Sequence, residues 1–211
     1  STPKPSSAAS DVYKRQHLHL RPHRQTAGGY IVRFRGQAHF LEHMVFIGSK
    51  LLAKGEFDSQ IEALGGSSNA ATGFDDVHFH VLVPPPALGK ALELLMELVL
   101  NPRLGDEEFE TEREVVLEEI EQYKDEPEEN IFQALLESCC PNHPYGRPIL
   151  GFESTLKKMD SQQMRAFHQR RYVAPNCCLS IAGDIPKGLD QVISNSLLNE
   201  LNRDCSRNDH Q

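Results

Sequence analysis

The sequence predicts a fold of the α+β class, with a mostly antiparallel or mixed sheet. Three observations indicate this class. Residues 67–72 and 77–83 are two strand-like runs separated by a short turn, which is the pattern of a hairpin. Long helical patterns follow over residues 87–140, and an apolar strand pattern returns at residues 176–182. A hairpin followed by several consecutive helices is typical of an α+β domain rather than of strictly alternating strands and helices.

Composition and charge narrow the class of function. The chain has 211 residues, 25% of them charged and 39% hydrophobic, which is ordinary for one globular domain with a substantial core. The net charge of -8 argues against a nucleic-acid partner, which would select a basic surface. The longest apolar run, residues 91–100, is interrupted by Glu93 and Glu97, so we expect no membrane span.

The two ends of the chain differ from its middle. Residues 1–25 are rich in Pro, Ser, Ala, Arg and His and contain one acidic residue, Asp11. A transit peptide has a similar composition, but residues 6–16 are similar to a stretch found at the ends of unrelated transcript-derived sequences. We therefore expect a non-native or disordered tail over residues 1–25, the domain over residues 26–190, and a weakly patterned tail over residues 191–211.

In the first half of the domain, glycines and prolines separate the expected elements. A short strand is expected at residues 30–34, a helix from Gly36 to near Gly48, and a short helix at residues 57–64 that ends at two glycines. In the hairpin, alternate residues of the second strand are apolar and should share one face: Val77, Phe79, Val81 and Val83.

The second half is mainly helical. Three prolines end the hairpin, and helices are expected at residues 87–100, at residues 106–124, where the helix is strongly acidic, and from Pro127 to about residue 140. A loop is expected over residues 141–151. Asp160 is a suitable N-cap for a helix to about residue 171, and the apolar strand at 176–182 is expected to be buried.

The strongest chemical signal is the pattern His-x-x-Glu-His at residues 39–43. In a helix, His39 and His43 lie one turn apart on one face, where two imidazoles can bind one Zn²⁺. Glu42 borders that face and can reach a water molecule on the metal. The neighbouring residues are apolar, which is unlike a solvated helix, and buried imidazoles and carboxylates need partners. A hydrolytic zinc site also needs a third protein ligand, so the chain must supply another carboxylate or histidine.

The acidic helix at residues 106–124 is the expected source of that ligand. Glu112 and Glu119 lie two turns apart on one stripe, with the apolar Val115 and Val116 between them on the same side. Glu119 could complete the site, with Glu112 just outside it. Spacing alone leaves Glu118 and Glu121 as alternatives.

Two other groups of residues allow a metal or redox interpretation. His78 and His80 share the polar face of their strand, where they could form a second metal site; we favour an ordinary, partly exposed sheet face. The five cysteines fit neither a zinc pattern nor an even disulfide framework: Cys139, Cys140, Cys177, Cys178 and Cys205. We interpret them as buried, reduced thiols, which favours a soluble protein of the cytoplasm.

Four segments, in this order and spacing, resemble the catalytic N-terminal half of a known family. They are residues 38–46 (AHFLEHMVF), 62–70 (EALGGSSNA), 112–120 (EREVVLEEI) and 143–151 (HPYGRPILG). Between about residues 36 and 183 the chain is similar to the pitrilysin, insulin-degrading enzyme and mitochondrial processing peptidase family of zinc metallopeptidases (inverzincins), and most of all to its bacterial members.

The resemblance implies a fold, a cofactor and roles for particular residues. It implies a sheet with helices packed on one side, and Zn²⁺ bound by His39, His43 and Glu119. It makes Glu42 the general base and Glu112 an acidic residue near the site. It also implies that Asn69 and Ala70 lie on the edge strand along which a peptide substrate is added as a further strand.

The chain departs from the family pattern in two ways. Family members have one or two strands before the motif, which residues 28–37 and the tail replace here, so we expect the domain to be incomplete at its start. They also have a second homologous half. We expect this chain to be a fragment without that half, or to bind it as a separate partner subunit. Three hypotheses follow: a zinc metalloendopeptidase domain acting on peptides or unfolded proteins, a non-catalytic zinc-binding subunit of a peptidase-like complex, or a metal-free structural domain.

Overall fold

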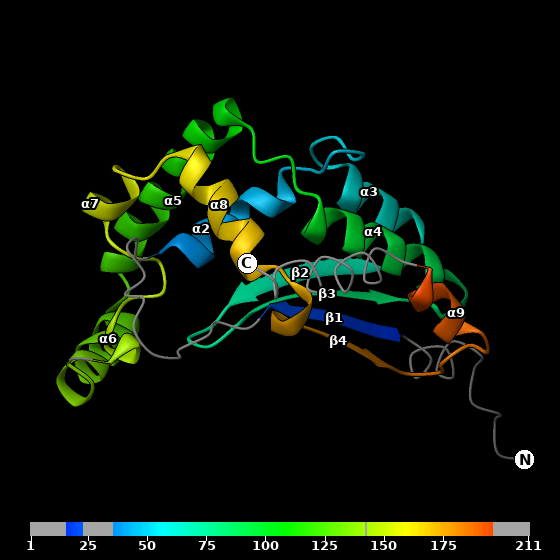
Figure 1. Ribbon diagram of the computed structural model, residues 1–211. Coiled ribbons are helices and arrows are strands. Elements are labelled where there is room, and N and C mark those ends of the chain that lie inside the picture. The colour runs from blue at the N-terminus through cyan, green and yellow to red at the C-terminus, as the bar shows by residue number, and fades with distance from the viewer. Residues whose placement is uncertain (1–15, 23–35, 142, 196–211) are drawn as a thin grey trace, which may run out of the picture.

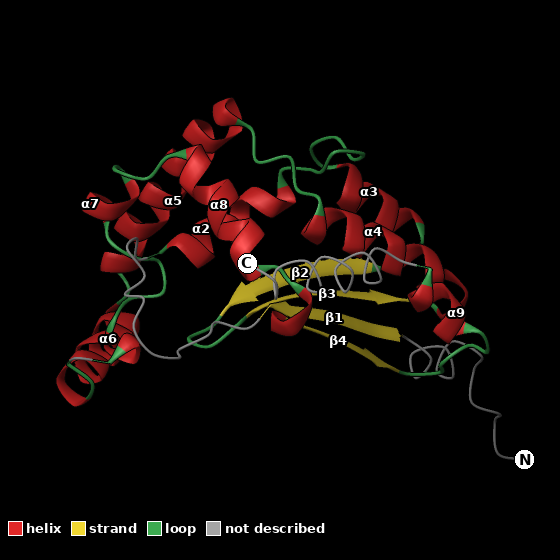
Figure 2. Cartoon of the chain, in the orientation of Figure 1, coloured by secondary structure: helices red, strands yellow, loops and turns green. Residues whose placement is uncertain are grey.

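Four strands form one antiparallel sheet in the order β2-β3-β1-β4 (Figures 1 and 2). Their bounds are Gln16–Pro22 (β1), Ser67–Thr72 (β2), Val77–Val83 (β3) and Cys177–Ala182 (β4). This computed structural model describes residues 16–22, 36–141 and 143–195. The expected strand at residues 30–34 lies outside the described residues.

The hairpin forms as predicted. β2 pairs antiparallel with β3, and Ala70 lies opposite Phe79. Alternate residues of β3, from Val77 to Val83, are buried on one face, which is the pattern of a strand with one side in the core. His78 and His80 lie on the other face, half-buried, with ring centroids 5.9 Å apart. Neither belongs to a cluster of three metal-binding side chains within the described residues.

Strand β1 corrects the expectation for the N-terminal tail. Residues 16–22 are neither tail nor disordered, because they pair with β3 on one side and with β4 on the other; Leu18 lies opposite both Val81 and Ile181. A strand in this position satisfies backbone donors and acceptors of both neighbours, which would otherwise face solvent. Residues 1–15 and 23–25 of the expected tail lie outside the described residues.

Helices pack on one face of the sheet, as expected. Helices α2 (Gln37–Phe46), α3 (Glu56–Ala63) and α4 (Leu88–Leu100) contact the hairpin strands, and Figure 1 shows α3 and α4 on the same side of the sheet. Helices α5 (Asp106–Lys124) and α8 (Ser161–Arg171) pack on α2. The largest buried side chains between these layers include Phe40, Phe79 and Phe109, all with no exposed surface.

Three shorter or peripheral helices complete the fold: α6 (Pro127–Cys139), α7 (Glu153–Leu156) and α9 (Leu189–Ser194). Helix α6 extends away from the sheet and none of its residues is buried (Figure 1). Helix α9 crosses the expected boundary at residue 190, so the domain extends at least to residue 194; residues 196–211 lie outside the described part.

Two expectations about burial are wrong. Strand β4 is an edge strand, and its residues alternate between half-buried and exposed because only one face meets the core. The described thiols are free, but none is buried: Cys139 and Cys178 are exposed, and Cys140 and Cys177 are half-buried. Of the described cysteines, Cys177 packs against the edge of the core, and Cys205 lies outside the described residues.

Two buried polar side chains, Glu97 and His168, hold helix α4 to its surroundings. The carboxylate of Glu97 accepts hydrogen bonds from Ser49 Oγ (2.7 Å), Asn101 Nδ2 (2.8 Å) and Leu51 N (3.2 Å). His168 Nε2 of α8 donates to the carbonyl oxygen of Val99 (2.8 Å). These contacts compensate for removing the polar groups from water.

The start of α2 lies against the loop that precedes α7. Its N-cap, Gly36, has φ 85°, and a Cβ there would lie 2.2 Å from the carbonyl oxygen of Leu150. Only glycine permits both the left-handed backbone and this close approach. No helix within the described residues combines the length and apolar character needed to cross a membrane.

Candidate metal centre

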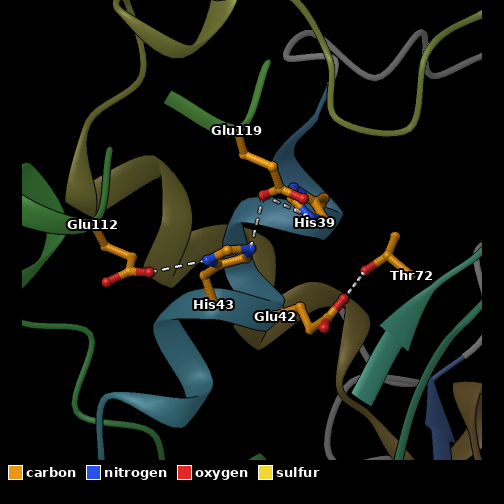
Figure 3. Close-up of polar contacts among 6 residues, drawn as sticks. All are labelled: His39, Glu42, His43, Thr72, Glu112 and Glu119. Atoms are coloured by element: carbon orange, nitrogen blue, oxygen red, sulfur yellow. Dashed lines mark hydrogen bonds and ion pairs between the residues drawn. The ribbon is translucent and has the colours of Figure 1, made fainter. Parts of the chain in front are cut away.

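Two histidines of α2 lie side by side on the helix face that meets α5 (Figure 3). Their ring centroids are 4.7 Å apart, and His39 is only 8% exposed. The spacing of four residues places the rings one turn apart, as the sequence predicts. Packing of α2 on α5 then orients this face, since the rings of Phe40 and Phe109 lie 4.7 Å apart beside it.

Helix α5 brings one carboxylate to both imidazoles. Glu119 Oε2 lies 3.5 Å from Nε2 of His39 and 3.3 Å from Nε2 of His43. Within the described residues, these three side chains form the one group of at least three His, Cys, Asp or Glu residues whose ligand atoms all lie within 4.8 Å of one another. The alternatives left open by spacing do not belong to this group: Glu118 is exposed, and Glu121 pairs with Lys124.

The arrangement fits a zinc ion. With bonds of about 2.1 Å, the donor atoms of a tetrahedral zinc site lie about 3.4 Å apart. The two distances from Glu119 to the imidazole nitrogens match this spacing. Glu119 Oε2 is also buried without a well-aligned hydrogen bond, which is costly unless another group binds it. Two imidazoles and one carboxylate are a ligand set that zinc uses in hydrolytic sites.

The second nitrogen of His43 is held by Glu112. Nδ1 of His43 lies 2.9 Å from Oε1 of Glu112, whose side chain is 15% exposed. A proton on Nδ1 donated to this carboxylate leaves the Nε2 lone pair facing Glu119 and the candidate metal position. Nδ1 of His39 is buried and has no hydrogen-bond partner among the described residues.

Without metal, the charges of this cluster form a strong ion pair. Burial lowers the pKa of His43, but the contacts with Glu112 and Glu119 outweigh burial and raise that pKa from 6.5 to about 9. Contacts with His39 and His43 lower the pKa of Glu119 from 4.5 to about 2. In the metal-free protein, the charged forms of His43 and Glu119 therefore stabilise each other.

Glu42 points away from the three candidate ligands, toward strand β2. Figure 3 shows its carboxylate turned to Thr72, and Oε2 accepts a hydrogen bond from the Thr72 hydroxyl. Both side chains, together with His39 and Glu119, line a pocket of about 300 Å³. The rest of its wall is largely apolar: Ala71, Phe74, Tyr123, Glu129, Phe132, Gln133, Pro148, Ile149 and Leu150.

Asn69 and Ala70 lie on β2, an edge strand of the sheet, but do not line the pocket. Asn69 is exposed, and its Oδ1 accepts a hydrogen bond from the backbone N–H of Ala70 (2.8 Å). That N–H therefore points away from β3, toward the open side of the strand. The pocket begins one residue further along β2, at Ala71.

Sequence reasoning missed two residues near the site. Thr72 ends a strand of small residues, and no pattern there signals a contact with Glu42, which is 30 positions away. Tyr145 donates from its hydroxyl to Asp75 Oδ2 (2.7 Å), across 70 positions. Tyr145 belongs to one of the four segments that carry the family resemblance, and this membership was the one sign in the sequence that the residue could matter.

Comparison with known sequences finds a matching family model and similar proteins. The sequence model of insulinase, peptidase family M16, matches residues 33–153. A protein named as an uncharacterized zinc protease from Mycobacterium leprae is 34% identical over 150 residues, 71% of this chain and 34% of the relative. Coenzyme PQQ synthesis protein F of Pseudomonas putida is 37% identical over 164 residues, 76% of this chain and 21% of the relative.

Comparison with solved structures also finds proteases. A protease from Helicobacter pylori superposes with a TM-score of 0.80 at 26% identity, over 88% of this chain and 45% of that one. Pitrilysin superposes with a TM-score of 0.72 at 25% identity, over 87% of this chain and 20% of that one. The chain thus spans about a third of the length of the zinc protease relative from M. leprae and less than half of either solved structure.

Proposed function

The chain belongs to the insulinase family of peptidases, M16, and from this premise we propose that it is the zinc-binding catalytic domain of a metalloendopeptidase. His39, His43 and Glu119 are the proposed ligands of Zn²⁺, and Glu42 is the proposed general base. One observation carries the proposal: Glu119 Oε2 lies within 3.5 Å of both imidazole Nε2 atoms, at zinc-site spacing, beside a pocket that Glu42 also lines.

The residues of the chain would divide the chemistry among them. Bound zinc would lower the pKa of a water molecule and polarise the scissile carbonyl group. Glu42 accepts the proton of the attacking water and can return it to the leaving amine. Glu112 holds the Nδ1 proton of His43 and so fixes the ring with Nε2 directed at the metal position.

Strand β2 is the proposed platform for the substrate. Its outer edge carries the backbone N–H of Ala70, now bound by the Asn69 side chain, and an extended peptide could take that hydrogen bond as an added strand. Such a peptide would pass the pocket that begins at Ala71. The apolar wall of that pocket, including Phe74 and Phe132, suits apolar side chains of peptides or unfolded proteins.

A second homologous half is the proposed partner. The superposed protease of H. pylori matches this chain over 45% of its own length. Helix α6, which contributes Phe132 to the pocket wall, has exposed apolar side chains at Ile131, Phe132 and Leu135. A second half, in the same chain or as a separate subunit, would give the pocket an opposite wall.

Hydrolysis of an internally quenched peptide by the zinc-loaded protein tests the proposal. The assay includes the second homologous half, added as a separate protein or joined to this chain. We expect cleavage by the wild type, and loss of cleavage with full zinc content in Glu42→Gln, which keeps the shape of the side chain but removes the base. Zinc binding without cleavage would instead favour the non-catalytic zinc-binding subunit. If the protein takes up no zinc, even on reconstitution, both zinc-binding hypotheses fail and the metal-free structural domain is the remaining hypothesis.

A further inference from the structure

The turn between β2 and β3 is held at two points by side chains from other parts of the fold. At its start, the Thr72 hydroxyl donates to Oε2 of Glu42. Near its tip, Asp75 Oδ2 accepts a hydrogen bond from the Tyr145 hydroxyl (2.7 Å), and the ring of Phe74 lies 5.5 Å from that of Tyr145. Within the turn, the N–H of Gly73 donates to the Asp76 carbonyl oxygen (2.8 Å).

The segment that holds the tip is itself well anchored. Residues Pro144–Gly146 form one turn of 3₁₀ helix, and His143 Nδ1 accepts from the backbone N–H of Tyr145 (3.3 Å). The carbonyl oxygen of Gly146 accepts from Gln133 Nε2 of α6 (3.2 Å). A Cβ at Gly146 would lie 2.3 Å from the Cys140 carbonyl oxygen, so this segment packs directly on the end of α6.

The anchored turn fixes the position of the Glu42 carboxylate. Among the residues that the structure describes, Thr72 supplies the one hydrogen bond to its carboxylate, through Oε2. This contact selects one side-chain conformation of Glu42 beside the pocket that both residues line, and it leaves Oε1 without a hydrogen bond to the described residues. A general base must lie within hydrogen-bonding reach of the proton it takes, so a fixed carboxylate is an advantage for the reaction.

We propose that Thr72 is a positioning residue for Glu42, and that Tyr145, through Asp75, holds the β2–β3 turn so that the Thr72 hydroxyl stays in place. The inference deepens the proposed peptidase function and rests on the role of Glu42 in it. It links three separate stretches of the chain: the motif helix, the hairpin turn and the 143–146 segment.

Steady-state kinetics of peptide cleavage, with the same zinc-loaded protein and partner half, provide the first test. Thr72→Val keeps the β-branched shape but removes the hydroxyl, and we expect kcat to fall about tenfold, as a lost hydrogen bond to a charged group would give. KM should stay within about twofold, because the strand edge that would bind the peptide keeps its shape. Thr72→Ser, which keeps the hydroxyl, should recover most of the lost kcat, and zinc content should equal that of the wild type in both variants.

A matched control separates the hydroxyl at this position from threonine in general. Thr155→Val makes the same chemical change in α7, away from the pocket, and should leave kcat unchanged. Tyr145→Phe removes the outer anchor alone, so we expect a smaller fall in kcat, about threefold, and no additional fall when it is combined with Thr72→Val. Equal kcat for Thr72→Val and the wild type would overturn the inference while leaving the role of Glu42 intact.

A double-mutant cycle on unfolding tests the contact without using activity. If Thr72 and Glu42 interact, the unfolding equilibrium constants of Thr72→Val, Glu42→Ala (which removes the acceptor) and the double variant should depart from multiplicativity by about fivefold. A factor near one would overturn the contact. If the wild type cleaves nothing, or if Glu42→Gln still cleaves, the proposed function fails; the positioning role then fails with it, even where the cycle shows coupling.

Discussion

Glu112 should determine how tightly the centre binds zinc, although it is not one of the three candidate ligands. Its Oε1 lies 2.9 Å from Nδ1 of His43, and its side chain is 15% exposed, so water cannot easily replace it. To bind zinc through Nε2, His43 must keep its proton on Nδ1 and donate it to an acceptor. In Glu112→Ala, that proton has no acceptor on the protein.

The magnitude follows from the type of contact. A hydrogen bond with a charged partner contributes about 1.5 to 3 kcal/mol, and loss of such a support for a metal ligand weakens metal binding about 10- to 100-fold. We therefore expect the Kd for zinc of Glu112→Ala to rise about 10- to 100-fold, which corresponds to about 1.4 to 2.7 kcal/mol. Glu112→Gln keeps an oxygen acceptor without the charge, and a neutral hydrogen bond is about half as strong, so its Kd should rise only about three- to tenfold.

Competition with a chromogenic chelator measures these constants at fixed pH and salt. Glu118→Ala is the matched control, because Glu118 is an exposed glutamate of the same helix, and its Kd should stay within about twofold of the wild type. Circular dichroism of the metal-free proteins checks that α5 is intact in every variant. A Kd for Glu112→Ala equal to that of Glu118→Ala would refute the reasoning that the carboxylate acts through His43.

Three further predictions concern the ligand, the fold and pH. Glu119→Ala should abolish stoichiometric zinc uptake, as measured by elemental analysis after reconstitution, whereas Glu118→Ala should retain one zinc per chain; equal uptake would mean that the third ligand is a different residue. Glu97→Ala leaves three donors of a buried network without their acceptor, so the free energy of unfolding in urea should fall by about 2 kcal/mol, and a change below about 0.5 kcal/mol would contradict the role of this network. Burial lowers the pKa of His168, so its neutral form stabilises the fold above about pH 6.5, and this stabilisation is lost as the pH falls because the unfolded chain takes up the proton first. Relative to His168→Gln, the wild type should lose up to about 2 kcal/mol of unfolding free energy between pH 7.5 and 5; parallel stability profiles would exclude a buried neutral imidazole.

Elements whose pattern is local were predicted well. Helix α5 begins and ends at the expected residues, 106 and 124, and β3 shows the expected alternation of buried residues. Both patterns arise from repeats of a few residues that any helix or strand imposes on its own chain. Strand β1 was missed because its composition resembles a tail, and only pairing with β3 and β4 makes residues 16–22 part of the sheet.

The contacts around Glu42 could not be predicted, for a related reason. The register of the hairpin brings Thr72 to Glu42, and the packing of the 143–146 segment on α6 brings Tyr145 to Asp75. A shift of one residue in that register would turn the Thr72 side chain to the other face of the sheet. The small residues of β2 do not specify this register by themselves; it is set by the partner strand β3, whose apolar face packs in the core.

By itself, the sequence determined that His39 and His43 would share a helix face and that an acidic helix would follow with carboxylates at helical spacing. Spacing left three glutamates as candidates for the third position, and the family resemblance favoured Glu119. Only the tertiary structure brings Glu119 Oε2 within 3.5 Å of both imidazole Nε2 atoms, because the packing of Phe40 on Phe109 sets the rotation of α5 relative to α2 and turns Glu119 inward while Glu118 faces solvent. Spacing along a helix is a property of the chain, whereas the rotation of one helix against another depends on which side chains fill the space between them.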